Sequence, residues 1–74
     1  MIVALLIRVN WDTGKLSTRD FSNWNTLRAY LVELTENREV KRKINKSSIP
    51  GLIDIVDSLD DINTTYLLEI FSDQ

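Results

Sequence analysis

Residues 2–9 read Ile-Val-Ala-Leu-Leu-Ile-Arg-Val, and this run decides the fold. Its β-branched and aliphatic side chains are typical of a strand buried in a sheet. Apolar side chains occur at both odd and even positions, so both faces of the strand are apolar. We therefore predict a central strand, and we expect either a partner surface or a folded-over loop to cover its second face.

A hairpin is predicted directly after this strand. Residues 10–15 are rich in turn-forming residues, with Gly14 near their end. Residues 16–21 are polar and alternate only weakly, which is typical of an edge strand. The pattern indicates two antiparallel strands joined by a short turn.

A first helix is predicted after Ser22 or Asn23, either of which can cap it. Its apolar positions recur at helical spacing and are Trp24, Leu27, Leu31 and Leu34. The register fails near residues 36–38, so we expect a break there. We interpret residues 41–48 as a basic connector.

A second helix is predicted after Ser48, with Pro50 in its first turn. Its apolar arc would hold Leu52, Ile55, Val56, Leu59 and Ile62. Asp60 and Asp61 oppose the macrodipole near a helix C-terminus, which favours a stop at this point. The helix would therefore close before the last segment begins.

Residues 64–71 fit either a strand or a continued helix. We choose a strand that pairs parallel to the first strand, and the alternative is a helical end with ββαα order. The predicted fold class is a small two-layer α+β domain of ββααβ order, with a three-stranded sheet and two helices on one face.

Charge divides this single predicted domain, residues 1–74, into two parts. All nine Lys and Arg residues lie in residues 1–46, where five acids give a net charge of 9 − 5 = +4. Residues 47–74 contain six acids and no base, a net charge of −6. The basic part holds the hairpin and first helix, and the acidic part holds the second helix and terminal strand. Such asymmetry bears on partners rather than on fold.

The acidic part supplies the first candidate contact surface. Its carboxylates either form a solvated helix face or dock on a basic groove, and regularly spaced carboxylates can imitate nucleic acid phosphates. Trp11 at the hairpin turn is either a lid over the sheet or an exposed anchor. The candidate partner-binding residues are Trp11, Asp54, Asp57, Asp60 and Asp61.

The segment 38–46 supplies an alternative, basic site. Its bases either contact phosphate or an acidic partner, or they gather where a helix C-terminus favours positive charge. A sequence pI near 4.9 argues against nucleic acid as the main ligand. The alternative site residues are Lys41, Arg42, Lys43 and Lys46.

Several function classes are disfavoured. The chain has no Cys and no His, which excludes disulfides, thiolate metal sites and conventional catalytic triads. Metal binding by Asp57, Asp60 and Asp61 lacks the spacing and turn glycine of a calcium loop. We expect no enzyme activity, no catalytic residues, no metal and no cofactor. The opening apolar run is too short for a signal peptide or membrane span, so we expect a cytoplasmic protein without a membrane partner.

These features predict a non-catalytic protein-interaction module, an inhibitor or regulator that occludes a site on a larger protein partner. A homodimer through the exposed sheet face is a further expectation. In its short length, acidity and richness in Ile, Asn and Asp, the chain resembles the small host-modulating proteins of phages and mobile elements, including anti-defence inhibitors. The alternative function is a small nucleic-acid-associated regulator that binds through residues 38–46.

Overall fold

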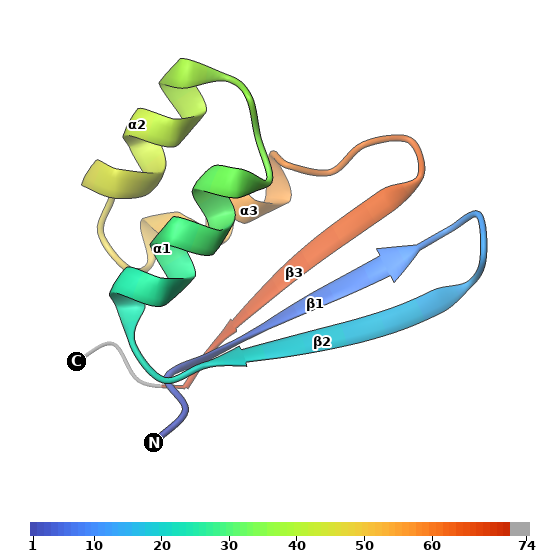
Figure 1. The fold of residues 1–74 in the computed structure, drawn as a ribbon, viewed down its shortest axis with the longest axis horizontal. Coiled ribbons are helices and arrows are strands. Elements are labelled where there is room, and N and C mark those ends of the chain that lie inside the picture. Colours follow the sequence, from blue (N-terminus) through green and yellow to red (C-terminus); the bar gives the residue numbers. More distant parts are fainter. Residues whose placement is uncertain (72–74) are drawn as a thin grey trace.

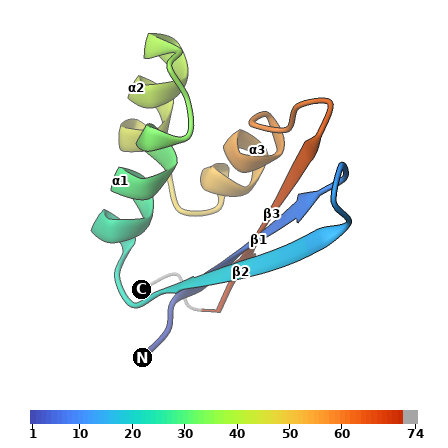
Figure 2. The same cartoon turned by 45° about the vertical axis from the view of Figure 1, so that its right-hand side comes forward.

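A computed structural model describes residues 1–71 of the chain. Its elements in order are β1 (Ala4–Asn10), β2 (Lys15–Phe21), α1 (Trp24–Glu33), α2 (Arg38–Lys46), α3 (Gly51–Asp57) and β3 (Thr64–Ile70). The sheet has the order β2-β1-β3, and the three helices lie on one side of it (Figures 1 and 2). The small α+β class, the hairpin and the central position of the first strand are confirmed.

Two details of the predicted topology are wrong. The structure has three helices rather than two, because the segment read as a connector forms α2. β3 pairs antiparallel to β1, not parallel. An extra helix reverses the chain direction once more, so the last strand enters the sheet from the opposite end.

The second predicted helix is also shorter than expected. α3 ends at Asp57, and Ser58 caps its C-terminus with a hydroxyl that donates to the Ile55 carbonyl at 2.6 Å. Ile62 therefore lies outside the helix and is 91% exposed rather than part of its apolar arc.

The hairpin turn is built from its own side chains. The Asn10 Oδ1 accepts from the Asp12 N–H at 3.0 Å and from the Thr13 N–H at 3.3 Å. Gly14 then adopts a φ of 71°, a left-handed conformation that costs other residues more. The turn thereby fixes the pairing of Asn10 with Lys15.

Asparagine side chains start the first two helices. The Asn23 Oδ1 accepts from the Thr26 N–H at 2.8 Å, as the sequence predicts for α1. The Asn37 Oδ1 accepts from the Glu39 N–H at 2.9 Å and from the Val40 N–H at 3.2 Å, and this cap starts α2. The break predicted at 36–38 is therefore a new helix start.

The helices form a layer of uneven depth over the sheet. α1 packs beside β2 and α3 packs on β3, while α2 packs on α1 and α3 at the outer edge of the layer (Figure 1). The largest fully buried side chains come from all three helices and are Leu27, Leu31, Ile44, Leu52 and Val56. The core thus lies between the helices and one face of the sheet.

The strand register defines two faces of the sheet. The covered face, toward the helices, carries Ala4, Leu6, Arg8 and Asn10 of β1, Lys15, Ser17, Arg19 and Phe21 of β2, and Thr64, Tyr66, Leu68 and Ile70 of β3. The open face carries Leu5, Ile7 and Val9 of β1, Leu16, Thr18 and Asp20 of β2, and Thr65, Leu67 and Glu69 of β3. Among residues 1–71 no helix or strand packs on the open face (Figure 2).

Candidate functional site

The open face presents apolar side chains to solvent. The three β1 residues at its centre are half-buried between the flanking strands. Leu16 on β2 is 64% exposed and Leu67 on β3 is 52% exposed. Leu67 pairs with Ile7 and Leu16 pairs with Val9, so the apolar side chains form one continuous patch. A contiguous apolar patch of this kind on a small protein is typical of an interaction site.

Carboxylates border one end of this patch. Asp20 and Glu69 lie on either side of Leu5 across the register, and both are exposed. None of the nine strand residues of the open face is a base. The face is therefore apolar along its middle and negative at one end.

Trp11 borders the other end of the patch. Its indole Nε1 donates to the Thr65 hydroxyl at 2.8 Å, and Thr65 belongs to the open face. The backbone N–H of Trp11 also donates to the Asn63 carbonyl at 2.8 Å. Trp11 is nevertheless 63% exposed, so its ring borders the face without covering it. The hydrogen bond to the sheet is what a lid would make, and the exposed ring is what an anchor would present. The structure of Trp11 thus fits both interpretations.

The four predicted acidic contacts lie on α3 and on the loop that follows it. Asp54 and Asp57 are exposed on α3, which packs on the covered side of the sheet. Asp60 accepts from the Tyr66 N–H at 2.7 Å, and Asp61 accepts from the Asn63 N–H at 2.8 Å. These last two carboxylates organise the loop before β3. The sheet separates Asp54 and Asp57 from the open face, which Trp11 borders.

The alternative basic site lies entirely on α2. Arg38, Arg42 and Lys46 recur every four residues on the face opposite Val40 and Ile44, and Lys41 and Lys43 flank that face on its two sides. The Arg42 Nη2 is 3.2 Å from the Glu39 Oε2, and both side chains are well exposed. That is the one ion pair among residues 1–71, and an exposed pair leaves α2 strongly basic.

A polar hollow on the covered face is a site that the sequence does not reveal. Its volume is about 230 Å³, and its lining includes Leu6, Arg8, Ser17, Arg19, Tyr30 and Tyr66. The signal available beforehand is strand alternation, which places Arg8 on the same face as Leu6. The partners on β3 and α1 follow only from the three-dimensional fold.

Residues 1–71 contain no group of three or more acidic side chains arranged to hold a metal ion. No helix in this part of the chain is both long enough and apolar enough to cross a bilayer. No protein-family model, no curated protein and no solved structure matches the chain.

Proposed function

We propose that this protein is a non-catalytic interaction module that binds a larger protein through the open face. The observation that carries this proposal is the exposed apolar patch around Leu16 and Leu67 on a sheet whose other face is already covered. Removing apolar surface from water contributes roughly 25 cal/mol per Å², so a partner with a matching apolar surface gains from covering it.

The charges around the patch favour a different protein over a second copy of this chain. Asp20 and Glu69 border the patch, and the open face offers no base to meet them. Two open faces packed together would bury these carboxylates without a cationic partner, at a cost in free energy. A partner with Lys or Arg beside an apolar strip would cover the apolar patch and also pair with the two carboxylates.

An inhibitor or regulator fits this mode of binding. A small rigid sheet can lie flat on a partner and block the surface it covers, and it needs no catalytic group of its own. The indole of Trp11, tethered to Thr65 at the rim, adds a preorganised aromatic contact.

The test compares capture by matched variants. Leu67→Lys places a charge in the patch, whereas Ile62→Lys makes the same kind of change at an exposed loop position away from the sheet faces. A specific partner should be captured by the wild type and by Ile62→Lys and lost with Leu67→Lys. If every captured protein is retained equally by Leu67→Lys, the open face is not the binding surface. Sedimentation of the pure protein identifies self-association, and a dimer abolished by Leu67→Lys would assign the face to a second copy.

A second candidate function rests on α2. α2 lies at the outer edge of the molecule (Figure 1), where a nucleic acid backbone can approach its bases without meeting the sheet. Binding of duplex DNA should then fall steeply with added salt. Neutralising Lys41, Arg42 and Lys43 together should abolish it, while Lys15→Gln on β2 should have little effect. Binding that is insensitive to the α2 changes would remove this candidate.

A further inference from the structure

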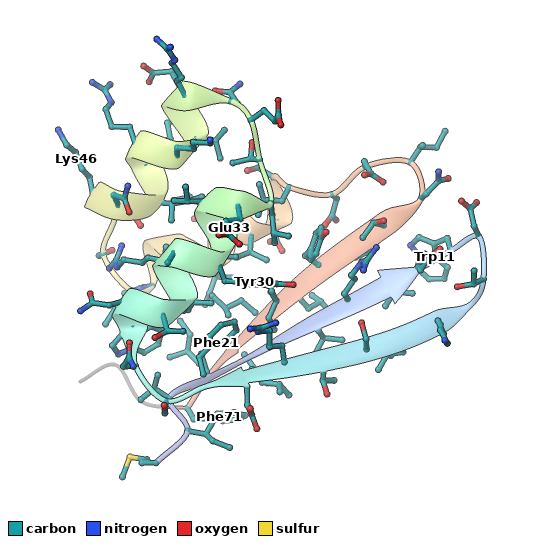
Figure 3. All side chains as sticks on the ribbon, in the orientation of Figure 1. Trp11, Phe21, Tyr30, Glu33, Lys46 and Phe71 are labelled. Carbon is teal, nitrogen blue, oxygen red and sulfur yellow. The ribbon has the colours of Figure 1, made fainter. Side chains whose placement is uncertain are left out.

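The hollow on the covered face lies where the sheet extends beyond the helices. The paired strands run past the end of the helix layer, so Arg8 and Ser17 are exposed although Leu6 on the same face is buried (Figure 1). Tyr30 points from α1 toward the sheet and forms one wall (Figure 3). The result is a recess with an apolar floor at Leu6 and a polar rim.

Strand register brings the two arginines of the hollow together. Arg8 pairs with Ser17 on one side and with Tyr66 on the other, while Arg19 pairs with Leu6. Arg8 and Arg19 are therefore diagonal neighbours on one face, a relation that separates Cβ atoms by about 7 Å. Long guanidinium side chains at that separation can reach a single ligand between them.

Aromatic rings hold one of these guanidinium groups in place. The Arg19 Cζ lies 4.5 Å from the centroid of the Tyr30 ring and 5.8 Å from that of the Phe21 ring. The two rings pack against each other with centroids 5.6 Å apart. Stacking on a ring face leaves the N–H groups at the edge of the guanidinium available to a ligand.

Neither arginine forms an ion pair with a carboxylate of residues 1–71. The ion pair found among residues 1–71 joins Arg42 to Glu39 on α2, far along the chain from this hollow. Arg28 differs from Arg8 and Arg19, because its guanidinium has a structural role. Its Nη1 donates to the Ile44 carbonyl and so links α1 to α2. Two like charges at diagonal positions on one sheet face repel each other, and an anion between them offsets that repulsion.

We infer that this hollow binds the phosphate group of a small phosphomonoester. Two guanidinium groups balance the charge of a phosphomonoester, which is about −1.5 to −2 near neutral pH, and their planar forks match its oxygen atoms. Ser17, Tyr30 and Tyr66 also line the hollow, and each carries a hydroxyl group that can donate a hydrogen bond. A carboxylate would use only part of this donor set.

The volume of the hollow suits a small group. At about 230 Å³ it is smaller than the ~300 Å³ typical of the smallest drug-sized sites, and a phosphate with a few attached atoms fits it. A phosphodiester carries a single negative charge and continues in two directions. The charge therefore favours a terminal phosphate over a nucleic acid backbone.

The test is a titration followed by amide chemical shifts, with methyl phosphate as the probe and ionic strength held constant. Dimethyl phosphate and acetate serve as controls of charge and shape. Methyl phosphate should move the amides of residues 8, 17, 19 and 66 along a saturating curve. Arg8→Gln and Arg19→Gln should each weaken binding about tenfold or more, since each removes charge-assisted hydrogen bonds. Arg42→Gln on α2 should leave the affinity unchanged.

Three results would overturn the proposal. Shifts that are absent, or that also occur on α2 and vanish with Arg42→Gln, would mean that no phosphate site exists in the hollow. Equal affinity for dimethyl phosphate or for a short DNA strand would assign the site to phosphodiesters. Third, the Arg19→Gln variant could keep its affinity for methyl phosphate while its native amide dispersion shows that it is folded. The stacked guanidinium would then not be part of the site.

Discussion

The covered and open faces of this sheet are built from alternate residues of the same strand, yet their surroundings differ greatly. On β1, Ala4 and Leu6 are buried beneath the helices, whereas Leu5, Ile7 and Val9 are only half-buried. Alternation in a strand sends neighbouring side chains to opposite faces. Side chains of equal hydrophobicity therefore stabilise the fold on one face and remain available to a partner on the other.

The two faces also differ in how their charges are treated. On the covered face Arg19 lies against Tyr30 and Phe21, and its charge is held in a defined place. On the open face Asp20 and Glu69 are exposed beside apolar side chains. The molecule thus offers a recess with positive charge on one side of the sheet and a flat surface with negative charge on the other.

The largest expected effect comes from truncating the covered face. Leu6 is 3% exposed, so Leu6→Ala should lower the free energy of unfolding by about 2–5 kcal/mol through lost burial and the cavity left behind. Urea unfolding followed by circular dichroism measures this loss. If Leu6→Ala lowers the free energy of unfolding by no more than a substitution at an exposed position does, the helices do not cover this part of the sheet.

The hairpin turn joins β1 to β2, which both contribute side chains to the two faces. A substitution in this turn should lower the free energy of unfolding by an intermediate amount. Gly14 has a φ of 71° and no neighbour within 4 Å of an added Cβ, so Gly14→Ala tests backbone conformation alone. The left-handed conformation should cost about 1–2 kcal/mol in unfolding free energy. Gly14→Asn is the matched control and should lose less, because asparagine tolerates this conformation better. Equal losses for the two variants would argue against a conformational origin.

Strand periodicity and local caps predicted much of this fold. The apolar run of residues 2–9 indicated a central strand, and Asn23 indicated the start of α1. α2 was missed because only Val40 and Ile44 mark its buried side, and a basic segment with two apolar residues reads as a connector. The direction of β3 was wrong for the same reason, since the missing helix changes the direction of the returning chain.

The candidate sites were less accessible to sequence reasoning. Asp60 and Asp61 read as part of an acidic surface, but they accept backbone N–H groups that only the folded loop brings to them. The hollow depends on Arg8, Tyr30 and Tyr66, which come from three elements. Their meeting requires both the strand register and the position of α1, and neither follows from spacing along the chain.

The smallest expected effect comes from the open face itself. Leu16 and Leu67 are more than half exposed, and threonine has a β-branched side chain suited to a strand. Leu16→Thr and Leu67→Thr should therefore each change the free energy of unfolding by no more than about 0.5 kcal/mol, as is usual for surface positions. Urea unfolding of the purified monomer, beside Leu6→Ala, makes the comparison direct. A loss near that of Leu6→Ala would mean that the open face is packed in the isolated protein, and its exposure would then no longer support a docking role.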